Sequence, residues 1–202
     1  MHDALAAFRS NMDDVEAFAS FYDFLVENMR GQKSLDDLLR SKIVCSVSAF
    51  DKLLHDIIHI GIIDIYSGNR TSTPKYLDEP IPLGVVAQLK GVEDAPRSNI
   101  FSQTIRDKLR AMSFQHPDKV VDGLSYIWHE KRKWKKIASA MGEDEATVRV
   151  FLYEVVRRRN AIAHEADVHH FLQAKRPIDR EMATDFTRFM RRLGETIHEL
   201  VR

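Results

Sequence analysis

The sequence predicts an all-α protein, a bundle of six or seven helices in one domain. Apolar residues recur at every third or fourth position along most of the 202 residues, which is the spacing of helices with one buried face. No stretch alternates apolar and polar residues for more than a few positions, and no internal repeat is found. The length fits a single domain, which we divide into an N-terminal helical extension, residues 1–33, and a core bundle, residues 34–202.

Two long helices open the predicted bundle. Residues 3–30 place their apolar side chains on one face, and Gly31 is expected to stop this helix. Ser34, with Asp37 three residues later, opens the second helix as a near capping box. That helix continues to the polar turn that begins near Gly68 and is apolar around much of its circumference. We therefore expect it at the centre of the bundle.

Breaker residues interrupt the middle of the chain. Residues 69–82 contain three prolines among polar residues, which predicts a long loop that is either functional or a simple connector. Asp179 is the predicted N-cap of the last helix, and residues 169–176 are expected to connect it to the helix before. The remaining apolar stripes predict helices over 83–90, 98–112, 118–141, about 143–165, and 179–201.

The charge of the chain is balanced, with 30 basic and 30 acidic residues. A nucleic-acid or membrane partner would therefore need a local patch. The one cysteine, Cys45, lies in an apolar run and cannot form an internal disulfide. The N-terminus lacks the pattern of a signal peptide, and the longest apolar run, residues 59–66, is much shorter than the ~18 residues of a membrane span. We expect a soluble protein of the reducing cytoplasm without a membrane partner.

Several kinds of site find no support in the sequence. Glycine-rich phosphate-binding loops are absent. His55 and His59 are four residues apart, a spacing that can hold a metal, but they are flanked by apolar residues and lack the glutamate of an H-E-x-x-H motif, so core or interface histidines are expected. His164, His169 and His170 have no recognised ligand spacing. We expect neither a metal nor a cofactor.

One cation lies on an apolar stripe. In the predicted helix 143–165, Val148, Leu152 and Val155 recur at helical spacing, and the next position of the stripe is Arg159. A guanidinium stays protonated and is costly to bury without a partner. The position therefore predicts that a carboxylate, a phosphate or a facing subunit contacts Arg159.

Asn160 and His164 complete a polar constellation within one and a half turns of Arg159. Asn160 and His164 are four residues apart and share a neighbouring face of the helix. Arg159 and His164 are five residues apart, roughly 140° around an ideal helix. On one helix, these two side chains therefore point in directions too different for both to contact a single phosphate well.

The stretch Arg159-Asn160-Ala161-Ile162-Ala163-His164 resembles the signature of HEPN domains, an arginine, four to six residues and a histidine, commonly with a polar residue straight after the arginine. The segment 38–56 is similar to the first core helix of the prokaryotic RiboL-PSP-HEPN subgroup. The resemblance spans roughly residues 35–200. It implies a helical homodimer in which two motifs meet across the two-fold axis, and metal-independent cleavage of RNA, often in toxin–antitoxin or phage-defence systems with an antitoxin or defence protein as partner.

The resemblance also implies roles for the motif residues. An imidazole has an unperturbed pKa of about 6.5 and suits removal of the 2′-hydroxyl proton, the role of His164. A guanidinium is shaped to stabilise the charge that builds on the phosphorane, the role of Arg159. Asn160 would orient the phosphate or the imidazole. The expected products are a 2′,3′-cyclic phosphate and a 5′-hydroxyl.

Two groups of cations extend the expected surface for single-stranded RNA. Arg157 and Arg158 directly precede the motif, and either could instead be a surface residue paired with Glu154 or Asp167. A basic run over 129–136 suits a phosphate backbone, although it also fits a solvated helix face anchored by a core tryptophan. The cations of this run are Lys131, Arg132, Lys133, Lys135 and Lys136.

Two further interpretations remain open. HEPN domains without catalysis are known, so the chain also fits a non-catalytic RNA-binding, protein-binding or scaffold protein of the same fold. It also fits a helical interaction protein of unrelated origin, in which Arg159 forms an ion pair inside the bundle.

Overall fold

The computed structural model describes residues 1–28, 35–91, 94–169 and 171–202, and within these ranges it is almost entirely helical. The described part contains nine helices and two strands of two residues each. The helices are α1 (His2–Asn28), α2 (Asp36–Tyr66), α3 (Pro74–Leu77), α4 (Leu83–Lys90), α5 (Asp94–Arg110), α6 (Pro117–Leu124), α7 (Lys133–Met141), α8 (Glu145–Glu165) and α9 (Arg180–Val201). The strands are β1 (Val168–His169) and β2 (Ala174–Lys175). The prediction of a mostly helical chain is confirmed, but the predicted count of six or seven helices is too low, because loop 69–82 contains α3 and the predicted helix 118–141 is divided into α6 and α7.

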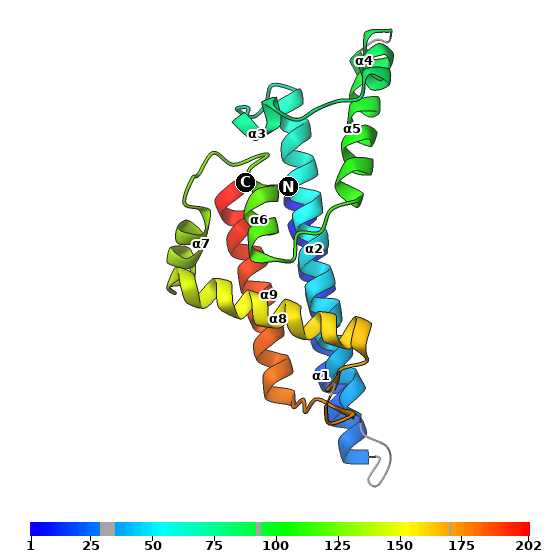
Figure 1. The fold of residues 1–202 in the computed structure, drawn as a ribbon, viewed down its shortest axis with the longest axis vertical. Coiled ribbons are helices and arrows are strands. Elements are labelled where there is room, and N and C mark those ends of the chain that lie inside the picture. The colour runs from blue at the N-terminus through cyan, green and yellow to red at the C-terminus, as the bar shows by residue number, and fades with distance from the viewer. Residues whose placement is uncertain (29–34, 92–93, 170) are drawn as a thin grey trace.

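Three long helices form the frame of the molecule. α1 runs antiparallel to both α2 and α9, and α8 crosses this frame (Figure 1). The two chain ends lie side by side, and the Nε2 atom of His198 is 3.2 Å from the carbonyl oxygen of Met1. Gly194 allows α9 to lie close to α1, because an added Cβ atom at this position would lie 2.6 Å from the ring of Phe8.

The second helix has the central position that its composition predicts. α2 contacts α1, α5, α6, α8 and α9. Its buried apolar residues point in several directions, and most of them join one continuous core with residues from these neighbours, while Leu39 and Ile43 form a smaller cluster with Ala183 of α9. The buried apolar side chains of this helix include Ile43, Val47, Phe50, Leu53, Leu54, Ile57, Ile58 and Ile62.

The predicted helix 118–141 is wrong in its middle, where the structure has α6, an irregular segment and α7. Loop 69–82 supplies the physical reason. The backbone carbonyl of Tyr126 accepts a hydrogen bond from the Thr73 hydroxyl at 2.9 Å, and the carbonyl of Ile127 accepts one from Arg70 at 2.9 Å. These carbonyls are engaged by the loop and not by helical amides, and the loop itself is anchored and contains α3.

The connector before α9 contains the two strands of the described residues. β1 and β2 pair antiparallel, with Val168 opposite Lys175 and His169 opposite Ala174. The predicted N-cap of α9 is confirmed, because Asp179 accepts a hydrogen bond from the backbone N–H of Met182 at 2.8 Å. The predicted helix stop at Gly31 and the cap at Ser34 lie outside the described residues. Within the described part, every helix is too short or too polar to cross a lipid bilayer.

Candidate functional site

The stretch that carries the Arg159–His164 motif forms the C-terminal half of α8. Asp144 caps the start of this helix, because its side chain accepts a hydrogen bond from the backbone N–H of Thr147 at 3.0 Å. Val148, Leu152 and Val155 are buried, as their spacing predicts. Buried apolar contacts at the middle of the helix therefore fix the rotation of α8 and determine which way each motif residue faces.

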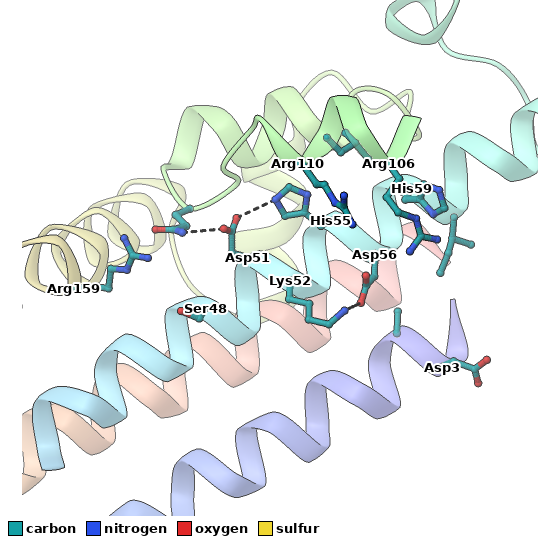
Figure 2. A pocket seen from close by; sticks show the side chains of 14 residues that line it. Asp3, Ser48, Asp51, Lys52, His55, Asp56, His59, Arg106, Arg110 and Arg159 are labelled. Carbon is teal, nitrogen blue, oxygen red and sulfur yellow. Dashed lines mark hydrogen bonds and ion pairs between the residues drawn. The ribbon is translucent and has the colours of Figure 1, made fainter. Parts of the chain in front are cut away.

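Arg159 faces a cleft. It is half-buried and lines a cavity of about 620 Å³ whose other residues come from α1, α2, α5 and the segment after α5 (Figure 2). Its Nη1 donates to the side-chain oxygen of Asn160 at 3.0 Å. Its Nε is buried without a hydrogen-bond partner, and no carboxylate among the described residues lies within ion-pair distance. An internal ion pair therefore does not account for this cation.

The neighbouring arginine, Arg158, is the one that forms a buried ion pair. Its Nη2 donates to Oδ2 of Asp167 at 2.8 Å and to the carbonyl oxygen of Pro177 at 2.8 Å. The same carboxylate oxygen accepts a hydrogen bond from Nε of Arg40 at 2.8 Å. Burial lowers the pKa of the Arg158 guanidinium and the facing Asp167 carboxylate acts in the opposite direction, so the group remains a cation.

A left-handed turn brings Asp167 under the end of α8. Ala166 and Asp167 have φ angles of 49° and 59°, and the backbone N–H of Asp167 donates to the carbonyl oxygen of Ala161 at 2.8 Å. This closure is typical of a helix C-terminus. The alternative in which Arg158 pairs with Asp167 is confirmed, and the predicted contact of Arg158 with RNA stays a prediction.

Asn160 and His164 lie on the outer face of α8. At helical spacing they continue an exposed stripe of Val150, Tyr153 and Arg157. Arg157 pairs with Glu154 at 2.5 Å, so its expected ion pair is also confirmed. This stripe joins two exposed apolar side chains to two polar residues of the motif.

The three motif residues do not converge within one chain. Asn160 lines a second cavity, of about 740 Å³, on the other side of α8, together with Arg157 and Arg158. His164 is exposed in the last turn of the helix and lines neither cavity. Arg159 and His164 therefore face different surroundings, as their angular separation on the helix predicts.

The basic run 129–136 lies away from the motif. It belongs to the segment before α7 and to the start of α7, which packs beside the other end of α8 (Figure 1). Lys133 is buried and donates to the carbonyl oxygen of Glu130 at 2.6 Å, while the indole N–H of Trp134 donates to the carbonyl oxygen of Pro117 at 3.2 Å. The described chain does not bring these cations and the motif into one site. The other cations of the run are exposed.

The cleft at Arg159 contains residues that the motif search missed. α2 presents a polar edge to it, and Arg106 and Arg110 face it from α5. The signal was present in the sequence as polar residues spaced by three or four within the otherwise apolar α2. These α2 residues are Ser48, Asp51, Lys52, His55, Asp56 and His59.

The two histidines of the cleft have different surroundings. His59 has its Nε2 3.2 Å from the carbonyl oxygen of Ser102, and burial lowers its pKa below the ordinary value. His55 packs against the ring of Phe114, and its Nε2 is 3.9 Å from Asp51. Among the residues that the structure describes, no three His, Cys, Asp or Glu side chains lie close enough to form a metal site.

Comparison of the chain with protein-family models, with curated proteins and with solved structures finds no match. The resemblance to HEPN domains accordingly depends on the motif and the helix segment quoted for it.

Proposed function

We propose that the protein is a metal-independent endoribonuclease of the HEPN type, which acts as a homodimer with a composite site. The observation that supports this best is the divergence of the motif on α8. Arg159 faces a cleft without an internal carboxylate partner, whereas His164 is exposed on the outer face. A second copy of the chain that binds to this face can place its own motif next to the motif of the first copy.

The outer face of α8 has the character of a contact surface. Val150 is 60% exposed and Tyr153 is 47% exposed, on the stripe that leads to Asn160 and His164. Contiguous exposed apolar patches mark interaction sites, and we infer that these two side chains belong to one. A two-fold contact is self-complementary, so each protomer would offer its histidine to the arginine of the other.

The chemistry needs one base and one fixed cation. His164 takes the proton of a 2′-hydroxyl, and the resulting oxygen attacks the adjacent phosphorus. Arg159 of the other protomer stabilises the charge on the phosphorane through its guanidinium. The bond from phosphorus to the 5′-oxygen breaks, and the leaving oxygen takes up a proton. The products are a 2′,3′-cyclic phosphate and a 5′-hydroxyl.

The first experiment is incubation of the protein with single-stranded RNA in EDTA. We expect cleavage to cyclic-phosphate ends, and we expect His164→Ala to abolish it while the protein stays folded. His2→Ala is the matched control, because His2 is also an exposed histidine at the end of a helix. Cleavage that persists in His164→Ala would refute the assignment of the base.

A mixing experiment tests the composite site. Arg159→Gln and His164→Ala are each expected to be inactive alone. In a mixture, about half of the dimers are heterodimers, and each keeps one intact pair of arginine and histidine. We expect recovery of roughly a quarter of the wild-type activity. A mixture that remains inactive, with both variants dimeric, would place the two residues in separate roles.

The second candidate is a non-catalytic RNA-binding or scaffold protein of the same fold. The exposed α8 stripe favours it as much as it favours catalysis, since either requires a partner on that face. The two candidates differ in one result. A folded, dimeric protein that binds RNA and leaves it intact would establish the binding protein, and the search would turn to an antitoxin or a defence protein as its partner.

A further inference from the structure

Four cations line the cleft, Lys52, Arg106, Arg110 and Arg159, against three carboxylates, Asp3 on α1 and Asp51 and Asp56 on α2. Both oxygens of Asp51 are occupied, one by the backbone N–H of Phe114 at 2.7 Å and the other by the amide of Gln115 at 2.9 Å. Asp56 is paired with Lys52 at 2.7 Å. The acidic groups on the α2 side of the cleft therefore already have partners inside the protein.

The arginines of the cleft, in contrast, have few carboxylate partners among the described residues. Arg106 has no carboxylate within ion-pair distance among the described residues, and the same holds for Arg159. Arg110 has only Asp107, at 3.4 Å and one helical turn away. Arg106 and Arg110 are exposed and four residues apart, so they share one face of α5.

These cations lie apart along the cleft. Figure 2 shows Arg159 at one end, Arg106 and Arg110 toward the other, and Asp51 with His55 between them. A single phosphate would need the guanidiniums gathered around one point. Cations distributed along a trough instead match the repeated charges of a nucleic-acid backbone.

The remaining lining suits the rest of a nucleotide. Ile60 and Leu109 are among the apolar residues of the cleft, and the imidazole of half-buried His55 lies between the two groups of arginines. Single-stranded nucleic acids are bound by grooves that combine cations for the backbone with flat or apolar surfaces for the bases. The volume of about 620 Å³ is that of a ligand-sized site.

We propose that this cleft binds the single-stranded RNA that flanks the scissile phosphate, with Arg159 at the catalytic end and Arg106 and Arg110 holding phosphates farther along the strand. The inference rests on the proposed function, because Arg159 belongs both to the motif and to the cleft. A dimer has two such clefts, so the strand leaves the composite site along α2 and α5 of one protomer. A free mononucleotide offers the same phosphate chemistry, and the experiment separates the two ligands.

The test measures RNA binding without cleavage. A fluorescein-labelled single-stranded RNA of about twelve nucleotides is titrated in EDTA with the His164→Ala protein, and its anisotropy is followed at several salt concentrations. The comparison is between that protein and one that also carries Arg106→Gln and Arg110→Gln. We expect binding to weaken on the order of tenfold, and the slope of log K against log salt to fall by about 1.4 for two lost contacts to single-stranded phosphates.

The matched control removes two arginines elsewhere. Arg188→Gln and Arg202→Gln take away exposed cations whose only carboxylate partners in the described part of the chain are Asp185 and Glu199, three residues from each. We expect this control to keep both the affinity and the salt slope. A further variant, Arg106→Lys with Arg110→Lys, keeps the charge and is expected to keep most of the slope. Equal RNA affinity in the cleft variant and in the control would overturn the inference.

A mononucleotide arm identifies the ligand. AMP is titrated into the same variants by calorimetry. AMP binding that depends on Arg106 and Arg110, together with RNA binding that does not, would overturn the strand path in favour of a small-nucleotide site. RNA binding that depends on both arginines supports the strand path whether or not AMP also binds.

The design keeps the two proposals separable. If the wild type cuts no RNA but the His164→Ala protein binds RNA through Arg106 and Arg110, catalysis is refuted and the cleft assignment stands. If the wild type cuts RNA and the cleft variant cuts it with unchanged KM and kcat, the nuclease stands and the cleft assignment falls.

Discussion

Arg158 and Asp167 form an ion pair at 2.8 Å in which the carboxylate is fully buried, directly behind the motif on α8. The same carboxylate oxygen accepts a hydrogen bond from Arg40 of α2 at 2.8 Å. Arg40 and Arg158 also both donate to the carbonyl oxygen of Arg176. One acidic side chain thus ties the start of α2, the end of α8 and the hairpin together, and it holds in place the turn of helix that presents His164.

Replacement of Asp167 by asparagine is expected to destabilise the fold strongly. The amide keeps the shape of the side chain but leaves the buried guanidiniums of Arg40 and Arg158 without their shared anion, a change that typically costs about 3–5 kcal/mol. Urea denaturation measures the loss. Asp23→Asn is the control, because it removes one partner of an exposed pair with Arg180 and is expected to cost about 1 kcal/mol or less. Similar costs for the two variants would contradict a central role for Asp167.

Substitutions of the neighbouring residues Arg158 and Arg159 are expected to differ in their effect on the free energy of unfolding. Arg158→Gln breaks the buried pair and frees the carbonyl of Pro177, so we expect a loss of about 2–4 kcal/mol in the free energy of unfolding. Arg159→Gln removes a side chain without a carboxylate partner among the described residues and is expected to change that free energy by less than about 1 kcal/mol.

Cleavage is expected to separate the same two variants. Arg159→Gln should abolish RNA cleavage although it is folded, and Arg158→Gln should retain cleavage at temperatures where it is folded. Thermal denaturation and the RNA assay, run on the same preparations, give both results. Unfolding of Arg159→Gln would instead support an internal structural role for this residue.

Stability is expected to fall as the pH drops below about 6.5. Burial lowers the pKa values of His59 and His198 in the folded protein, whereas the unfolded chain has ordinary histidines with a pKa of about 6.5. Below that pH the unfolded state binds more protons than the folded state, so the free energy of unfolding falls with falling pH. Each histidine contributes a slope of at most about 1.4 kcal/mol per pH unit.

The pH effect can be assigned by substitution. In His59→Gln the amide can take the place of the ring N–H that faces the carbonyl of Ser102 and does not titrate. We expect this variant to lose less stability than the wild type between pH 7.5 and 5.5, roughly the span that covers the pKa of an ordinary histidine. His2→Gln, at an exposed position, serves as the control. Parallel curves for wild type and His59→Gln would show that His59 is not the group responsible.

The helices were largely predictable from the sequence because most of them bury one apolar stripe and the central α2 is apolar around much of its circumference. The break between α6 and α7 could not be predicted from the sequence, because the apolar spacing continues through Tyr126 and Ile127, both of which are buried. What ends the helix there is a pair of hydrogen bonds from Arg70 and Thr73, more than fifty residues away. Periodicity indicates which side chains are buried, but it does not indicate which donors form hydrogen bonds with the backbone carbonyls.

In the candidate site, too, the apolar spacing predicts the burial of a side chain but not its partner. The stripe on α8 correctly indicates that Arg159 turns toward the interior. It gives no sign that Arg158 is the arginine with a buried anion, because that pair depends on the left-handed turn at Ala166 and Asp167. The partner of a charged side chain is set by where the chain goes after the helix ends.

That turn offers a last prediction. Ala166 has a φ angle of 49°, a conformation that costs an L-residue with a side chain roughly 1–2 kcal/mol and that glycine adopts readily. We expect Ala166→Gly to raise the free energy of unfolding by up to about 1 kcal/mol. Ala163→Gly is the control, since Ala163 is exposed within the helix, where the same substitution is expected to lower it by about 1 kcal/mol. Opposite signs in urea denaturation would confirm that the end of α8, and with it the position of His164, depends on a strained turn, and a loss in both variants would contradict it.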